Sequence, residues 1–495
     1  MPTASALDQP VPQRSHAFLL GGLIVCFIGV YAALYPRTFS ILDEQAHLSF
    51  AVALAKGTVY ADVAGVDSVR TIRIGEHLAP RIGLGTSLLF APIVNRSWRA
   101  CFAIVLGAHL IGVLACAGAL RKVELPVWYA ALYLFHPVAA LYSRTAMSDV
   151  PTMTLMMLGL WLYLGPRSRP FLAGLCWGLM PHFRFAQAVA IAALGAGVFL
   201  RDLIHSHRVG RIDLRRSLLM GVGLCPGVLS WLALNTLIYG GPLDTPISWP
   251  LSAEYLPANL PRYLLSQNLI YPFALLVALF FPSRVRLECV LLSVALLGLY
   301  GCFKFLYQGF GPASILIGDR FFLPLFPLIV IPYAGALDWL LSRSGRWASL
   351  LTLAGLVALA TLYLGISIGH DTRLDRQSAV QDLLYDSTPP GSIILLNPNA
   401  REYLFAPLGD RVHMRPPAFL PEGGGYDPET RSLIRDAIPD VYVFTVVRID
   451  REGLTKQRAE SILSFASEHY EVEEVAQVNA WPDQIHLLRL TAERP

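Results

Sequence analysis

Two adjacent carboxylates, Asp43 and Glu44, follow the first apolar segment of the chain, and His47 lies one helical turn further on. They belong to residues 39–56, FSILDEQAHLSFAVALAK, at the predicted end of a membrane span. Ionisable side chains are costly at membrane depth and often mark functional sites there. A desolvated carboxylate can act as a general base. The same residues are also typical of a helix start, in which Ser40 caps the helix and Asp43 completes a capping box.

Three further polar features stand beside apolar segments at distant points of the chain. Asp149 precedes an apolar run, Arg184 separates two such runs in HFRF, and Arg320 opens another in GDRFF. Each has a structural explanation of its own. Asp149 could cap a helix, Arg184 could extend to lipid headgroups, and Arg320 could pair with Asp319 or Asp149. Taken together with Asp43, they are predicted to lie at one depth on one membrane face.

This combination of side chains suits the transfer of a group from an anionic lipid to a hydroxyl. Arginine presents a planar fork of donors that matches phosphate oxygens, and it keeps its charge. It would bind a lipid phosphate and stabilise the charge on that phosphate as it leaves. A carboxylate would remove the proton of the attacking hydroxyl. A sugar on a polyprenyl phosphate meets both requirements. Lys304, inside an apolar segment, either reaches the outer surface or contacts the same phosphate.

Apolar segments must position these side chains. Of the 495 residues, 54% are hydrophobic and 15% are charged, whereas soluble globular chains carry about 25% charged residues. The chain is therefore expected to be a polytopic α-helical membrane protein. We predict about eleven transmembrane segments, at residues 18–35, 100–120, 126–142, 150–164, 171–180, 183–200, 218–239, 269–281, 288–305, 321–341 and 347–368. The two shortest, 171–180 and 269–281, either extend through neighbouring residues or enter the membrane and return.

Lysine and arginine are concentrated in alternate short loops, which sets the orientation of the spans. Residues 1–15 are predicted to form a cytoplasmic tail, residues 16–369 the transmembrane domain, and residues 36–99 its first outer loop. Within that loop, residues 77–94 contain Pro and Gly and are predicted to lie in the membrane interface. The net charge of +4 is too small and too scattered to indicate nucleic-acid binding.

Residues 370–495 have shorter apolar runs and more charge, and we predict a small α/β domain on the outer, extracytoplasmic side. Strand-like runs at 392–396, 441–447 and 485–490 alternate with a helix-like stretch at 455–470. The seven cysteines all lie in apolar segments and form no CxxC or Cys/His cluster. This distribution argues against a structural zinc site and against a disulfide framework. The role of the domain and the oligomeric state stay open.

Over residues 15–368 the sequence resembles the integral-membrane glycosyltransferases of the C-type fold (GT-C). These include the aminoarabinose transferases of lipid A and the protein O-mannosyltransferases. The resemblance rests on the order of six stretches: LDEQAHLSFAVALAKG, HLAPRIGLGTSLLFAPI, LRKVELP, HPVAALYSRTAMSDVPTMTLMML, GLMPHFRFAQAV and GDRFFLPLFP. The sequence departs from the family pattern in two places, which bear on the identity of the acceptor and of the lipid more than on the fold. The second stretch lacks the family's P-P-x-Y-P run, and HFRF lacks a Pro after its Arg.

The resemblance implies that Asp43 is the catalytic base and that Asp149 is a second functional acid. Glu44 and Asp149 would orient the acceptor or the base, and Arg184 and Arg320 would bind the donor phosphate. The expected enzyme moves a sugar from a polyprenyl-phosphate carrier to a hydroxyl of a glycolipid, a glycan or a protein. The anomeric configuration would invert. The expected location is the outer face of a bacterial-type cytoplasmic (inner) membrane.

No cofactor is required by this expectation. A divalent metal stays open because some members of the fold use one. Its candidate ligands are Asp43, His47 and Asp149, with His77, and Asp43 and His47 are spaced to share one helix face. Two other classes of function also stay open. A transporter or flippase of lipid-linked glycans needs broken helices and internal repeats, and the sequence indicates neither. A non-catalytic membrane scaffold would not need Asp43.

Overall fold

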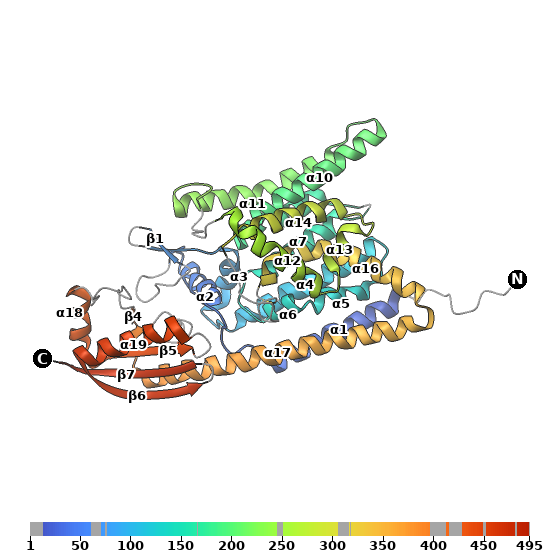
Figure 1. Cartoon of the computed structure of the whole chain (residues 1–495). Coiled ribbons are helices and arrows are strands. Elements are labelled where there is room, and N and C mark those ends of the chain that lie inside the picture. The colour runs from blue at the N-terminus through green and yellow to red at the C-terminus, as the bar shows by residue number, and fades with distance from the viewer. Residues whose placement is uncertain are drawn as a thin grey trace. The chain divides into compact units, whose positions relative to one another are not determined.

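The computed structural model describes residues 13–60, 71–74, 77–165, 167–244, 251–304, 316, 318–396, 412–414, 428–448, 452–480 and 483–494. Contacts between residues divide the chain into two compact units. The first comprises Met1–Tyr35, Arg81–Leu89 and Ala100–His370, and the second comprises Pro36–Pro80, Phe90–Arg99 and Asp371–Pro495. Figure 1 labels their elements.

Helices make up the secondary structure of the first unit in the part of the chain that is described. They are α1 (Gln13–Ala33), α4 (Ala100–Lys122), η1 (Val127–Tyr129), α5 (Ala130–Leu134), α6 (Pro137–Tyr142), α7 (Asp149–Tyr163), α8 (Pro170–Gly178), α9 (Met180–Phe183), α10 (Gln187–Val209), α11 (Arg215–Tyr239), η2 (Ala253–Tyr255), α12 (Leu256–Leu269), α13 (Ala274–Phe280), α14 (Arg286–Gly301), η3 (Arg320–Leu325), α16 (Phe326–Arg343) and η4 (Gly345–Trp347). Helices α3 (Gly85–Val94) and α17 (Ala348–Ser387) contribute residues to both units.

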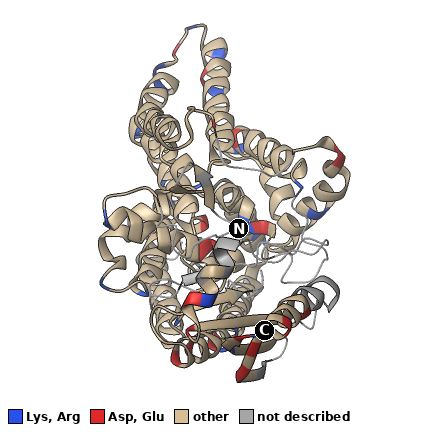
Figure 2. Cartoon of the chain, turned by 90° about the vertical axis from the view of Figure 1, so that its left-hand side faces the viewer, with Lys and Arg blue, Asp and Glu red and all other residues tan. Residues whose placement is uncertain are grey.

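Long apolar helices make the chain a multi-pass membrane protein. Among the described residues, 6 helices are long and apolar enough to cross a membrane: His16–Ala33, Ala100–Lys122, Gln187–Val209, Arg215–Tyr239, Arg320–Arg343 and Ala348–Ser387. The pair Ala253–Leu269 and Ala274–Phe280 passes the same test but is bent by 90°, as in a broken span or a re-entrant loop. Figure 2 shows helices whose length is mostly free of charged residues. The count of eleven segments stays a prediction.

The apolar segment at residues 126–142 is divided into η1, α5 and α6. A proline disfavours the helical conformation of the residue before it, and His136, which precedes Pro137, has φ −57° and ψ 118°. The His136 ring then accepts a hydrogen bond from the Ala139 amide at 3.3 Å and caps α6. The break is therefore encoded locally, by one His-Pro dipeptide within a long apolar run.

Helices α8 and α11 cross with their backbones in direct contact. A Cβ on Gly223 would overlap the Phe171 carbonyl oxygen, and a Cβ on Gly227 would overlap the backbone of Gly178. A Cβ on Gly178 would lie 2.6 Å from the Leu224 carbonyl oxygen. Small residues spaced four apart on both helices permit this approach, which is how membrane helices associate closely without a hydrophobic driving force.

The second unit combines α2 (Leu42–Ala55), the hairpin β1 (Thr71–Ile74) and β2 (His77–Pro80), and a mixed sheet near the C-terminus. The sheet order is β4-β3-β5-β7-β6. Strand β3 is parallel to β4 and β5, whereas β7 is antiparallel to β5 and β6. Its elements are β3 (Ile393–Leu396), β4 (Val412–Met414), α18 (Pro428–Ala437), β5 (Val441–Arg448), α19 (Glu452–His469), β6 (Tyr470–Ala480) and β7 (Asp483–Glu493).

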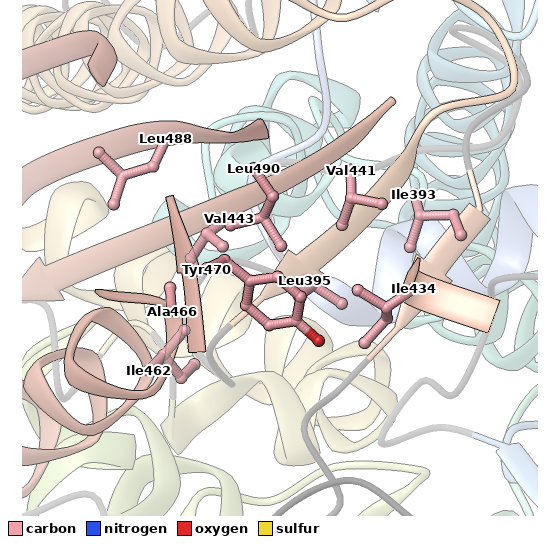
Figure 3. Close-up of a cluster of buried hydrophobic side chains, with 10 residues drawn as sticks. All are labelled: Ile393, Leu395, Ile434, Val441, Val443, Ile462, Ala466, Tyr470, Leu488 and Leu490. Atoms are coloured by element: carbon pink, nitrogen blue, oxygen red, sulfur yellow. The ribbon is translucent and has the colours of Figure 1, made fainter. Parts of the chain in front are cut away.

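Side chains alternate between the two faces of this sheet along each strand. Both faces are covered by other elements. Residues Val441, Val443 and Leu490 pack with α18 and α19 through Ile434 and Ile462, as Figure 3 shows. The alternate residues, on the opposite face of the sheet, pack against Val380 and Leu384 at the end of α17. These sheet residues are Ile394, Tyr442, Phe444, Val446, Ile485 and Leu487. Two buried faces make the central strands almost continuously apolar, as is typical of such sheets.

The predicted strands at 392–396, 441–447 and 485–490 and the helix at 455–470 are confirmed as β3, β5, β7 and α19 within one or two residues at most boundaries. The hairpin, α18, β4 and β6 were not predicted from the sequence. Strand β6 has the sequence YEVEEVAQVNA and lies at a sheet edge, where charged side chains protect against unwanted pairing but obscure the strand pattern.

Helix α17 continues well beyond the predicted apolar segment at 347–368. The hydrophobicity of the sequence falls over residues 370–387, but the helix continues because this stretch contains neither Gly nor Pro. Pro389, Pro390 and Gly391 then follow, and Gly391 has φ 84°. One helix therefore carries residues of both units.

We expect Gly223→Ala to lower the free energy of unfolding by about 1–3 kcal/mol, because the new methyl group must push α8 away from α11. The thermal unfolding midpoint in detergent should fall accordingly. Gly221→Ala is the matched control, since no atom lies within 4 Å of a Cβ built there. Equal midpoints for the two variants would contradict the tight crossing.

Candidate functional site

Asp149 is the first residue of α7 and is 1% exposed. Ser148 occupies the N-cap position, and its side chain makes no capping bond. Instead of capping the helix, the Asp149 carboxylate forms an ion pair with Arg184 through Oδ1. Its Oδ2 has no hydrogen-bond partner among the described residues. Asp149 therefore links two helices and keeps one acceptor oxygen available.

Arg184 lies in the break between α9 and α10, with an extended backbone at φ −150° and ψ 122°. This break directs the side chain toward Asp149, and the side chain is 16% exposed. Its Nη1 also donates a hydrogen bond of 3.4 Å to the Arg320 carbonyl oxygen. The segment before α3 supports the same region closely, because a Cβ on Gly83 would overlap the His182 carbonyl oxygen.

Arg320 begins η3 and is 7% exposed. Its guanidinium carbon lies 5.1 Å from the centre of the Phe321 ring and 5.9 Å from that of Tyr142. The guanidinium of Arg184 lies 4.9 Å from the same Phe321 ring. Tyr300 packs on Phe321 as well, with the ring centres 5.0 Å apart. One aromatic ring therefore supports two cations, an arrangement stabilised by cation–π attraction in a desolvated site.

The cluster of Asp149, Arg184, Arg320, Phe321 and Tyr300 carries two guanidinium groups and one ion-paired carboxylate. Taking charges out of water costs several kcal/mol per ion, so such groups persist when they are paired or needed for binding. The buried hydroxyl of Tyr300 has no hydrogen-bond partner among the described atoms, like Oδ2 of Asp149. Guanidinium groups are suited to anions, and unpartnered oxygens of this kind are suited to a hydroxyl-bearing group.

The sequence pattern identifies the three charged members of this cluster but not Phe321 and Tyr300. Phe321 adjoins Arg320 in GDRFF, so that neighbour could have been found. Tyr300 ends an apolar helix, and nothing in its local sequence distinguishes it. Asp319 bonds the Ser266 hydroxyl of α12.

The predicted residues of the first outer loop belong to the second unit. The N-cap of α2 is Ile41, and Glu44, not Asp43, makes the contact with Ser40. Both the backbone N–H and the hydroxyl of Ser40 donate to Oε1 of Glu44, each at 2.8 Å. Glu44 is fully buried, whereas Asp43 is partly exposed. The expected capping box is therefore corrected: Glu44 holds the helix start, and this leaves Asp43 on the more accessible side.

The remaining predicted residues are Lys304, His47 and His77. Lys304 follows α14 and is exposed. His47 is buried in α2, and His77 in β2 stacks on Tyr60 with ring centres 4.8 Å apart. Within the described ranges, no three His, Cys, Asp or Glu side chains form a group that could hold a metal ion.

Comparison with solved structures identifies the fold. The structure is similar to crystal structures of ArnT from Cupriavidus metallidurans in the apo state (TM-score 0.59, 14% identity, 95% of this chain and 97% of that chain) and bound to undecaprenyl phosphate (TM-score 0.58, 14% identity, 96% and 98%). It is also similar to the oligosaccharyltransferase of Archaeoglobus fulgidus in the apo form (TM-score 0.51, 12% identity, 93% and 73%). The chain has the C-type fold of integral-membrane glycosyltransferases. No protein-family model and no curated protein matches it in sequence.

Burial raises the pKa of the Asp319 carboxyl, just before the span Arg320–Arg343, to about 7 from its ordinary value of 3.8. The folded state then keeps a proton that the unfolded state loses. Stability from this proton is complete below the ordinary pKa and is lost as the pH rises to about 7. We expect the wild-type unfolding midpoint in detergent to fall between about pH 5 and about pH 8 more than that of Asp319→Asn. Parallel pH profiles would contradict this role of Asp319.

Proposed function

We propose that the chain transfers a sugar from a polyprenyl-phosphate carrier to an acceptor hydroxyl. The observation that carries this proposal is the cluster around Phe321, in which the buried Arg320 and the partly buried Arg184 lie beside one carboxylate. It supports the proposal because a lipid phosphate requires cations at the edge of a membrane domain. The shared fold adds support, since the similar ArnT structure contains bound undecaprenyl phosphate.

Arg320 and Arg184 would bind the donor phosphate, with the exposed Lys304 adding a third cation. As the bond between the anomeric carbon and the phosphate oxygen breaks, negative charge grows on that oxygen. Fixed guanidinium groups in a desolvated site stabilise this charge without reorganising. The departing group is polyprenyl phosphate itself.

Asp43 would be the general base. It lies in the first turn of α2 and stays partly exposed, while its neighbour Glu44 is buried and bonded to Ser40. Asp43 would take the proton of the acceptor hydroxyl as the oxygen attacks the anomeric carbon from the face opposite the phosphate. The product would have the inverted configuration. Asp149 would hold Arg184 in place and offer its second oxygen to the acceptor or the sugar.

We place the reaction on the outer face of a bacterial-type cytoplasmic membrane, with the N-terminus in the cytoplasm and the C-terminal domain outside. The distribution of lysine and arginine among the loops supports this topology. The acceptor would be a glycolipid, a glycan or a protein.

Transport of a lipid-linked glycan is the second candidate, and the 90° bend between α12 and α13 favours it, because transporters use broken helices. Transport would require no base at Asp43. The substitution below therefore separates the two functions.

Asp43→Asn should reduce the release of free polyprenyl phosphate from labelled polyprenyl-phosphate sugars by at least about 10²-fold, since an amide cannot accept the proton. The measurement uses membranes that contain the full chain. Lys56→Ala, at the other end of α2, controls for expression and folding and should keep the wild-type rate. Full turnover by Asp43→Asn would remove the assignment.

Arg320 is a better test of donor binding than Arg184, because losing Arg184 would leave Asp149 buried and unpaired at a cost of about 3–5 kcal/mol. We expect Arg320→Gln to weaken binding of undecaprenyl phosphate about tenfold or more, through the loss of a charge-assisted contact. Arg320→Lys keeps the charge without the planar fork and should fall between Arg320→Gln and the wild type. Unchanged affinity in Arg320→Gln would contradict a role at the phosphate.

A further inference from the structure

The end of α17 holds the segment that precedes α2. Nη2 of Arg373 donates a hydrogen bond of 2.8 Å to the carbonyl oxygen of Ser40. Two turns further along, Oε1 of Gln381 accepts a 2.6 Å hydrogen bond from the hydroxyl of Thr38. Thr38, Ser40 and Gln381 are all buried, whereas Arg373 is exposed and its bond to Ser40 is partly buried. All these residues belong to the second unit.

The same segment then fixes the start of α2. Ser40, whose carbonyl oxygen is bonded to Arg373, uses its amide and its hydroxyl to bind the carboxylate of Glu44. All three polar groups of Ser40 therefore have defined partners. Asp43 directly precedes Glu44, so the direction of its side chain follows from this arrangement. A shift of Ser40 would rotate or fray the first turn of α2.

The C-terminal sheet in turn fixes the end of α17. Val380 and Leu384 of α17 are buried against Ile394, Phe444 and Leu487 of the sheet. Arg373, Val380 and Leu384 recur at helical spacing and so lie along one side of α17. The turn that carries Arg373 contacts the segment before α2, and the following turns contact the sheet.

We propose that Arg373 is a positioning residue for Asp43, and that the C-terminal sheet serves the reaction by supporting this contact through α17. The inference rests on the proposed function, in which Asp43 is the base. A base displaced by about 1 Å loses much of its effect, because proton transfer requires hydrogen-bond distance to the acceptor. The sheet would then contribute to catalysis without touching a substrate.

An ion pair between the same two segments provides a contrast. Arg37 and Asp375 lie 3.2 Å apart, but their side chains are 65% and 48% exposed. Exposed pairs of this kind contribute little, because water and salt screen them. Asp375 is two residues from Arg373 on the same helix. It is therefore a control that removes a contact between the same segments without disturbing Ser40.

The first experiment is hydrogen exchange of the full chain in detergent micelles, which needs no substrate. Arg373→Ala should speed exchange of the amides at residues 40–46 about tenfold or more, because the first turn of α2 loses its support. Arg373→Lys, which restores one donor, should reverse part of the change. Asp375→Asn should match the wild type. Wild-type exchange in Arg373→Ala, or equal acceleration in Asp375→Asn, would overturn the proposal.

The second experiment separates positioning from general destabilisation. Arg373→Ala should lower kcat about tenfold or more, while binding of undecaprenyl phosphate stays within about twofold of the wild type. Thr38→Val, which removes the bond to Gln381 with little change of shape, should show the same split to a lesser degree. A parallel loss of donor binding and kcat would indicate a merely structural role and overturn the proposal.

Different results would remove the catalytic base and the positioning role. An active Asp43→Asn would remove the base, yet the exchange experiment would still report whether Arg373 holds α2. An inactive Asp43→Asn together with a fully active Arg373→Ala would leave the proposed function standing and remove the positioning role.

Discussion

The partly buried ion pair between Asp149 and Arg184 constrains how the helices of the first unit approach one another. It joins the start of α7 to the junction of α9 and α10, and Arg184 also bonds the backbone of Arg320. Burying two charges costs several kcal/mol per ion, and only close pairing offsets that cost. The helices that carry these residues must therefore approach one another in a narrow range of arrangements, and Phe321 fills the space between the cations.

Glycine and proline set the backbone around that pair. The close crossing of α8 and α11 depends on glycines that face a neighbouring backbone, and the approach of the segment before α3 depends on Gly83. The division of residues 126–142 follows from Pro137. In each case a missing Cβ or the ring of a proline decides the local geometry, and close van der Waals packing then holds the helices together.

Hydrogen bonds of a single serine have a comparable role in the second unit. Ser40 connects Glu44 in α2 to Arg373 in α17, and α17 in turn packs on the C-terminal sheet. The two adjacent acids thereby acquire different environments. Glu44 is satisfied and buried, whereas Asp43 is partly exposed. Asp43 and Glu44 carry the same functional group, but the contact with Ser40 makes Glu44 a structural residue and leaves Asp43 accessible.

By itself, the sequence determined that this is a multi-pass membrane protein with a C-terminal α/β part, because hydrophobic runs and strand patterns are local properties. It also singled out Asp149, Arg184 and Arg320, since charges beside apolar segments are rare. Only the tertiary structure decided which groups are in contact. Tyr300 packs on Phe321, and Ser40 bonds Glu44 instead of Asp43. The first contact joins residues of different helices, and the second distinguishes between two adjacent acids. Packing of the whole chain determines both contacts, because local sequence preference does not specify them.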